Sequence, residues 1–180
     1  WDPLWQKDEP SDYLTCMLRS GDVEKRIKAT EQIIGIAGYE GRIGIAFDEW
    51  NLRGWHHPNG NSPEAIGARD RNDRNATYTM ADAVFAAGFL NTCLRHADSV
   101  RMANMAPVVN TRGPLYVHPG GVVKRTTYHA LWMYANLLGE RVADAWTRSD
   151  TLAKGEAAVA ALDAVATCDA TMREWRLALV

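Results

Sequence analysis

The chain has 180 residues, of which 47% are hydrophobic and 23% are charged, and its formal net charge is −2 with a pI near 6.2. These values are typical of a globular protein with enough apolar side chains for a core, and they exclude an intrinsically disordered chain. They give no electrostatic reason to expect a nucleic acid or an anionic membrane as a partner, and no apolar run is long enough to cross a membrane.

The three cysteines, Cys16, Cys93 and Cys168, are widely spaced, and the chain has no Cys-x-x-Cys pair. An odd number of cysteines at wide spacing is typical of reduced thiols, so we expect no disulfide framework and no zinc or dithiol site. Cys93 falls within a helical apolar pattern and is predicted to be a core residue. This use of cysteine favours a cytoplasmic location over secretion.

The N-terminal part of the chain is predicted to be helical. Ser11 is a candidate cap for a short helix that runs to about Arg19, and Asp22 is a candidate cap for a second helix that ends at Gly38. On the second helix, four residues at helical spacing share one face: Val23, Ile27, Thr30 and Ile34.

A short apolar strand is predicted at residues 43–49, and it ends in two acids, Asp48 and Glu49. An apolar run of this kind indicates a strand that is covered on both faces of a parallel sheet. In α/β folds, active sites form at the carboxyl ends of such strands. Because side chains alternate along a strand, Glu49 is expected to share a face with Phe47, and Asp48 to point the opposite way. We therefore predict Glu49 as the catalytic carboxylate and Asp48 as a supporting residue.

The middle of the chain predicts a βαβ arrangement. A polar stretch at 51–75 is predicted to be a long functional loop. Four elements are predicted to follow it: a helix at 79–97, a second strand at 100–109, a loop at 111–123 and an aromatic-rich helix at 126–138. Strands that are separated by helices in this way imply a parallel sheet.

Beyond Arg141 the pattern changes to that of a β domain. Weak alternation at 157–166 is followed by a predicted turn at 167–169 and an extended run at 172–180. A domain boundary is expected between residues 142 and 152. The Ala-rich stretch at 153–161 could also be helical.

The two ends of the chain favour a fragment of a longer protein. The chain opens on Trp1 without an initiator Met and closes on the strand-like run 175–180. An apolar strand without a partner would expose its hydrogen-bonding groups and its side chains.

A carboxylate at a strand end could bind a metal, hydrolyse a glycoside or form a structural ion pair. Metal binding requires further converging ligands, and the adjacent His56 and His57 are more typical of a solvated surface pair. Glycosidases use two carboxylates together with aromatic rings that stack on sugars, and Trp50 and Trp55 lie close to Glu49 in the sequence. A structural role for the acids, with the tryptophans in the core, stays open at this point.

Several motifs occur in one order along the chain: Phe47-Asp-Glu-Trp-Asn51, Gly88-Phe-Leu-Asn91, Leu94-Arg-His-Ala97, Val100-Arg-Met-Ala-Asn-Met-Ala106, Val109-Asn110, Thr126-Thr-Tyr-His129 and Met133-Tyr134. From about residue 12 to its end, the chain resembles the C-terminal half of the α-L-arabinofuranosidases of glycoside hydrolase family 51.

The resemblance implies that residues 1–145 form the C-terminal part of a (β/α)8 TIM barrel, and that residues 146–180 begin a C-terminal β-sandwich. It implies a retaining glycoside hydrolase that releases terminal α-L-arabinofuranosyl residues from arabinan, arabinoxylan or their oligosaccharides in L-arabinose metabolism. No cofactor and no metal are implied, and the full-length protein is expected to form a homo-oligomer.

The resemblance also assigns roles to residues. Glu49 would be the nucleophile, and Trp50, Asn51 and Trp55 would bind the substrate. The general acid/base would be a glutamate in an Asn-Glu motif, which no part of this chain matches, so the isolated chain is expected to be inactive. Pro107 stands where many members of the family carry a sugar-binding Gln.

Two alternatives follow from the same residues. One is an endo-acting glucanase or xylanase on the same scaffold, and the other is a non-catalytic half-barrel that only binds sugar. An upstream strand that ends in Asn-Glu would favour an enzyme over the second alternative.

Overall fold

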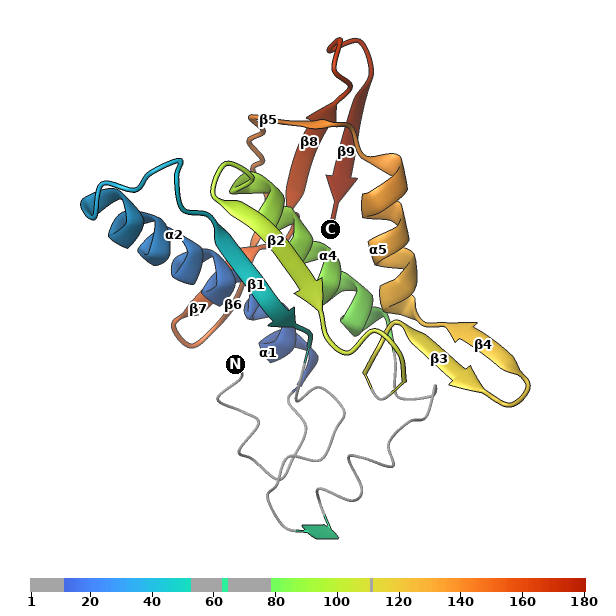
Figure 1. The fold of residues 1–180 in the computed structure, drawn as a ribbon. Helices are drawn as coiled ribbons and strands as arrows, with labels where there is room; N and C mark the ends of the chain where they lie inside the picture. Colours follow the sequence, from blue (N-terminus) through green and yellow to red (C-terminus); the bar gives the residue numbers. More distant parts are fainter. Residues whose placement is uncertain (1–11, 53–62, 65–78, 111) are drawn as a thin grey trace.

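The structure is a computed structural model that describes residues 12–52, 63–64, 79–110 and 112–180. Helices and short strands alternate along the chain, so the fold is mixed α/β, as the sequence predicts (Figure 1). Within these ranges, no helix has both the length and the apolar character needed to span a membrane.

Two helices begin the described chain: α1 (Tyr13–Leu18) and α2 (Ser20–Ile36). Asp12 caps α1, because its carboxylate accepts a 3.0 Å hydrogen bond from a backbone amide of the first turn. The predicted cap, Ser11, lies outside the described residues. The predicted cap of the second helix is wrong, since Asp22 lies within the first turn of α2, where its carboxylate is 2.9 Å from the Arg19 guanidinium. Gly38, with φ of 74°, follows the end of α2, as predicted.

The central unit consists of two parallel strands joined through a helix: β1 (Ile45–Trp50), α4 (Met80–Arg95) and β2 (Val100–Met105). It confirms the predicted strand, helix and strand, although β2 ends before the predicted Val109. Thr79 and Asp82 form a capping box at the start of α4, in which each side chain accepts from a backbone amide of the first turn. The start of this helix is therefore encoded locally.

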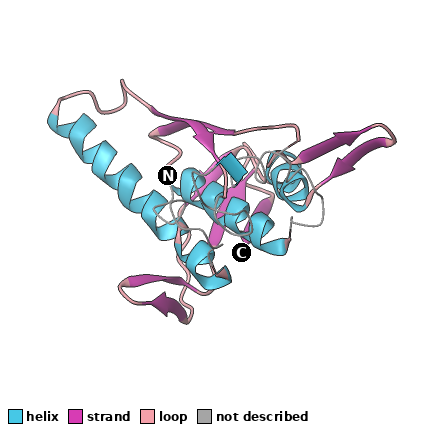
Figure 2. Cartoon of the chain, turned by 90° about the horizontal axis from the view of Figure 1, so that it is seen from below, coloured by secondary structure: helices cyan, strands magenta, loops and turns pink. Residues whose placement is uncertain are grey.

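A hairpin follows β2, and the predicted loop at 111–123 is wrong. Strands β3 (Leu115–His118) and β4 (Gly121–Lys124) pair antiparallel, and the hairpin projects from the molecule in both views (Figures 1 and 2). The Pro119-Gly-Gly signal forms only the turn, where Gly121 has φ of 140°. The aromatic and β-branched residues on either side of it favour strands.

Helix α5 (Thr126–Leu137) confirms the helix predicted at 126–138, and it packs against α4. The Tyr134 hydroxyl lies 3.0 Å from the carbonyl oxygen of Ala87 and 2.6 Å from Oδ1 of Asn91. Burial, and then the negative charge of Asp163, raise the pKa of Tyr134, so its hydroxyl stays protonated and can donate.

The C-terminal part is β structure, in five short strands: β5 (Arg141–Ala143), β6 (Thr151–Lys154), β7 (Ala157–Ala160), β8 (Ala164–Cys168) and β9 (Trp175–Leu179). The sheet order is β5-β8-β9, with antiparallel pairs, and β6 pairs with β7 as a hairpin. A helix at 153–161 is thereby excluded.

The predicted turn at 167–169 is also wrong, because Thr167 and Cys168 belong to β8 and the turn begins at Asp169. The Asp169 carboxylate accepts hydrogen bonds from the amides of Thr171, Arg173 and Glu174. Hydrogen bonds, that of the Thr171 hydroxyl above all, lower the Asp169 pKa to about 2.

Polar contacts join the C-terminal β strands to α1 and α4. In the β6–β7 hairpin, the Lys154 ammonium binds the Asp12 carboxylate at the start of α1 and lies 2.9 Å from the Thr15 hydroxyl. Beside β8, the Asp163 carboxylate accepts hydrogen bonds from Arg95 and Asn91 of α4. Figure 1 shows α4 behind β1 and β2, between these strands and the C-terminal sheet.

The core forms around α4. Apolar side chains of this helix are buried against β1, the end of β2 and α5, and they include Phe85, Phe89 and Cys93. Cys16, Cys93 and Cys168 are buried free thiols. Burial raises the pKa of Cys93 to about 12, in agreement with its predicted role as a core residue.

Candidate active site

The two predicted acids lie exposed at the carboxyl end of β1. Since β1 and β2 are parallel, their carboxyl ends lie at the same edge of the sheet (Figure 1). Asp48 and Glu49 are both exposed there. Among the described residues, neither carboxylate has a hydrogen-bond or ion-pair partner. Their lone pairs are therefore available to solvent or to a ligand.

The residues on either side of the two acids are anchored on one ring of α4. The Phe47 ring meets the Phe89 ring edge to face, with centroids 5.2 Å apart and an interplanar angle of 76°. The Trp50 ring stacks on the same Phe89 ring, with centroids 4.1 Å apart and an interplanar angle of 15°. Trp50 is only 7% exposed. The two acids are thus held between two aromatic anchors.

The prediction of strict alternation along this strand is wrong at its end. Phe47 pairs with Ala103 and Trp50 with Met105, so three steps along β1 match two steps along β2. This register shift places Phe47 and Trp50 against the same helix, whereas regular alternation would place residues three apart on opposite faces. The inference that Glu49 shares a face with Phe47 therefore loses its basis.

Asn104 is the residue of β2 that stands opposite the two acids. The paired residues Trp50 and Met105 are both buried, and the residues that precede them, Glu49 and Asn104, are both exposed. The two exposed side chains thus lie on neighbouring strands at the same level of the sheet. The sequence shows Asn104 near a strand end, but only the register of the two strands identifies it as the residue opposite Asp48 and Glu49.

Asn51 ties the strand end to the segment after β2. Its side-chain amide donates hydrogen bonds to the carbonyl oxygens of Ala106, at 3.3 Å, and Arg112, at 2.9 Å, and its oxygen accepts from the Leu52 amide at 2.9 Å. The Ala106 amide in turn donates to the Trp50 carbonyl oxygen at 3.1 Å. This arrangement fixes the backbone on both sides of the candidate site.

The remaining predicted site residue, Trp55, lies outside the described residues, as do His56 and His57. Within the described ranges, no group of three His, Cys, Asp or Glu side chains is placed to hold a metal ion. The arrangement at the end of β1 can thus supply one or two carboxylates and, from Asn104, a neighbouring amide. These groups suit nucleophilic or acid–base chemistry on a polar substrate.

Comparison with known proteins gives one consistent family. A family model described as "Alpha-L-arabinofuranosidase C-terminal domain" matches residues 48–176. The chain is 31% identical over 147 residues to an intracellular exo-α-(1→5)-L-arabinofuranosidase of Halalkalibacterium halodurans, a match that covers 76% of this chain and 27% of that protein. It is 34% identical over 96 residues to an exo-α-(1→6)-L-arabinofuranosidase of Bifidobacterium longum, a match that covers 52% of this chain and 18% of that protein.

Solved structures share the fold. An α-L-arabinofuranosidase of Thermotoga maritima, in complex with arabinose, superposes with a TM-score of 0.75 and 24% identity over 94% of this chain and 35% of that one. A family 51 α-L-arabinofuranosidase of Bifidobacterium longum gives a TM-score of 0.73 and 25% identity over 93% of this chain and 36% of that one. The chain therefore spans about a third of these enzymes, and 22% to 27% of the length of the first curated relatives.

Proposed function

The chain belongs to the family of the α-L-arabinofuranosidase C-terminal domain, and on this premise we propose that the full-length protein hydrolyses terminal α-L-arabinofuranosyl bonds. The substrates would be arabinan, arabinoxylan or oligosaccharides derived from them. The observation that carries this proposal is the exposed Glu49 carboxylate at the carboxyl end of β1, which has no polar partner among the described residues and lies in a segment that the family match includes.

In this proposal, β1 and β2 are the last strands of a (β/α)8 barrel. Their parallel pairing, the crossover through α4 and the acids at the carboxyl ends all support that architecture. The antiparallel sheet β5-β8-β9 would begin a β-sandwich. Its first strand starts at Arg141, which favours a boundary just before that residue over one between 145 and 146.

The proposed reaction is a retaining hydrolysis in two steps. In the first step, a Glu49 oxygen attacks the anomeric carbon and an acid protonates the leaving oxygen, so that an arabinosyl ester forms and the aglycone departs. In the second step, the conjugate base of the same acid takes a proton from water, and the water oxygen attacks the anomeric carbon. The bond from that carbon to the Glu49 oxygen breaks, so that arabinose and the Glu49 carboxylate are released. The acid/base would be a glutamate outside this chain, so the isolated 180 residues are expected not to turn over.

The neighbouring residues would position this nucleophile. The Trp50 ring and the Asn51 amide hold the backbone on the C-terminal side of Glu49. The amide nitrogen of Asn104 lies 3.1 Å from the Met102 sulfur, and in this proposal it would turn to donate a hydrogen bond to the sugar. In this proposal, Trp55 would stack on the sugar and Asp48 would be a supporting acid. Pro107 lies just beyond β2, at the position where the sequence resemblance expects a sugar-binding amide.

The location follows as a further part of the proposal. The relative from Halalkalibacterium halodurans is named intracellular, and the free thiols at positions 16, 93 and 168 are consistent with a reducing compartment. We therefore propose a cytoplasmic enzyme that acts on oligosaccharides.

Trapping of the covalent intermediate tests the proposal. The full-length protein would be incubated with a fluorinated arabinofuranosyl inhibitor, digested and analysed by mass spectrometry. We expect the label on the peptide that contains Glu49, and no label at this peptide in Glu49→Gln. Asp48→Asn is the matched control, because it changes the adjacent acid and should still be labelled. A label on any other carboxylate would exclude Glu49 as the nucleophile.

A further inference from the structure

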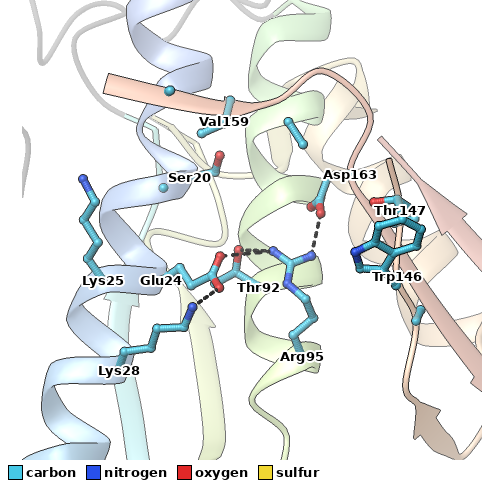
Figure 3. Close-up of a pocket in the computed structure, with 15 residues that line it drawn as sticks. Ser20, Glu24, Lys25, Lys28, Thr92, Arg95, Trp146, Thr147, Val159 and Asp163 are labelled. Carbon is cyan, nitrogen blue, oxygen red and sulfur yellow. Dashed lines mark hydrogen bonds and ion pairs between the residues drawn. The ribbon is translucent and has the colours of Figure 1, made fainter. Parts of the chain in front are cut away.

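A cavity of about 510 Å3 lies on the far side of α4 from the strand end. It is lined by residues of α2, α4 and β7, by the segment 145–147, and by Asp163 and Ala164 at the start of β8 (Figure 3). None of these lining residues comes from β1 or β2. The volume lies within the range of about 300–1,000 Å3 that is usual for small-molecule sites.

Five charged side chains line this cavity, and four of them pair with one another, whereas Lys25 has no ion-pair partner among the described residues. The Glu24 carboxylate lies 2.8 Å from the Lys28 ammonium and 3.7 Å from the Arg95 guanidinium. Arg95 also binds the Asp163 carboxylate at 2.5 Å, and it donates a 3.1 Å hydrogen bond to the Thr92 hydroxyl. Figure 3 shows these groups directed into one space. The lining therefore offers many hydrogen-bonding groups but no concentrated charge of one sign.

The ionisation of Glu24 agrees with this pairing. Burial acts to raise the Glu24 pKa. The hydrogen bond and the positive charge of Lys28, together with the charges of Arg95 and His96, act to lower it, and their combined effect is the larger. The pKa of Glu24 therefore lies below its ordinary value, and the carboxylate is ionised at neutral pH. A strongly charged ligand would have to displace one of these partners.

Trp146 adds an apolar surface to the same cavity. Its side chain lines the cavity and is 84% exposed (Figure 3). A sugar ring has an apolar C–H face that can cover an indole, and a rim of hydroxyls that can bind charged and polar groups beside it. Covering an exposed aromatic ring removes a large apolar area from water.

We propose that this cavity is a second, non-catalytic carbohydrate site, which binds a neutral arabino-oligosaccharide segment by stacking on Trp146 and by hydrogen bonds to Glu24, Arg95 and Asp163. This inference rests on the proposed function for the class of sugar. The site would hold part of a long substrate away from the strand end, and so raise its local concentration at the enzyme.

The first test counts binding sites in the full-length protein. A Glu49→Gln variant, which cannot turn over its ligand, is titrated with an arabino-oligosaccharide of four residues in a calorimeter. We expect two sugar molecules per chain, and one after Trp146→Ala is added. Trp175→Ala is the matched control, because Trp175 is also exposed, at 58%, but does not line the cavity, and two molecules should still bind.

Two outcomes of that titration would overturn the inference. One is a stoichiometry that Trp146→Ala leaves unchanged. The other is displacement of the sugar from this site by inorganic phosphate, which would indicate an anion site formed by Lys25, Lys28 and Arg95.

A kinetic test separates this inference from the proposed function. In the active enzyme, Trp146→Ala should leave the hydrolysis of a small chromogenic arabinofuranoside unchanged and raise the KM for polymeric arabinan by about three- to tenfold. An equal KM for the polymer in both proteins would contradict the second site alone. Absence of hydrolysis of the chromogenic substrate by the unmodified enzyme would contradict the proposed function.

Discussion

Acidic side chains have opposite surroundings in two regions of this molecule. At the end of β1, Asp48 and Glu49 are exposed and, among the described residues, have no polar partner. Around Arg95, between α2, α4 and β8, the acids Glu24 and Asp163 are each held by a cation. Both regions contact the same helix, α4, on different sides.

The two regions differ in what is held in place. In the first region it is the backbone beside the acids, and in the second it is the carboxylates themselves. The β1 acids are held through their neighbours Phe47 and Trp50, which pack on Phe89, and within the described ranges their own carboxylates have no polar partner. The acids around Arg95 are held by their own oxygens, so they stabilise the contact between helix and sheet. Substitutions in the first region should therefore change the rate, and those in the second should change the stability.

The largest effect is expected at Glu49. In the full-length enzyme, Glu49→Gln should lower kcat by roughly four orders of magnitude, because it removes the proposed nucleophile. The melting temperature should change little, since the side chain has no partner among the described residues. Steady-state kinetics with a chromogenic arabinofuranoside and a thermal melt measure both. Near-normal turnover would show that Glu49 has no catalytic role, and the proposed contrast between the two regions would then be wrong.

Phe89→Ala should have the next largest effect. It removes the ring on which both Phe47 and Trp50 pack, and the expected cost is about 3–5 kcal/mol of unfolding free energy. Urea titration of the full-length protein measures this loss. Phe89→Leu, which refills most of the space, should lose clearly less. Equal losses in the two variants would contradict this expectation, because they would show that the aromatic contacts themselves, and not the filled space, hold the strand end.

Asp163→Ala tests the second region. It removes the acceptor of both Arg95 and the fully buried Asn91, and leaving these donors without it should cost about 2–3 kcal/mol of unfolding free energy. The kcat for a small substrate should stay within about twofold. Asp163→Asn keeps one acceptor oxygen and should lose less stability. A large fall in kcat with unchanged stability would contradict the expectation that the acids around Arg95 act on stability and not on the rate.

The smallest effect concerns Glu31 on α2, which joins this helix to the turn between α4 and β2. Its carboxylate lies 2.8 Å from Nδ1 of His96 and accepts a hydrogen bond from the Ser99 hydroxyl. Burial acts to raise the Glu31 pKa, but the hydrogen bonds of Ser99 and His96 and the charges of His96 and Lys28 outweigh it, so the pKa lies below its ordinary value of 4.5.

A lowered carboxyl pKa contributes stability at pH values above the ordinary pKa, and this contribution is lost as the pH falls through the lowered pKa. Glu31→Gln should therefore be less stable than the unmodified protein at pH 7 by less than about 1 kcal/mol. The difference should shrink as the pH is lowered from about 6 to about 3. Urea midpoints across that range measure it, and a difference that grows toward acid would contradict the role of the Glu31 carboxylate.

The elements that the sequence predicts well are those whose signals are local. The helical apolar pattern around Cys93 and the continuous apolar run before Asp48 each lie within one element, so the sequence predicts both α4 and β1. The Pro119-Gly-Gly signal also predicts its turn correctly. The surrounding strands were missed, because four-residue strands leave little pattern.

The details of the candidate site depend on contacts between distant residues. The stacking of Trp50 on Phe89 joins residues 39 positions apart, and the bond from Asn51 to Arg112 joins residues 61 apart. The pairing of Trp50 with Met105, which identifies Asn104 as the residue opposite Asp48 and Glu49, likewise needs the register of two strands. A single sequence records none of these distances. The sequence therefore predicts Glu49, but it does not predict the packing on Phe89 or the position of Asn104.

The register shift in β1 has a consequence for how many side chains a strand end can present. In a regular strand, two rings that pack on one helix leave a single outward residue between them. The extra residue in β1 leaves two, so a pair of adjacent acids fits between Phe47 and Trp50 without either anchor leaving Phe89. Deletion of Asp48 would restore a regular strand with both anchors and a lone Glu49. One added residue is thus enough to give the proposed nucleophile a companion acid.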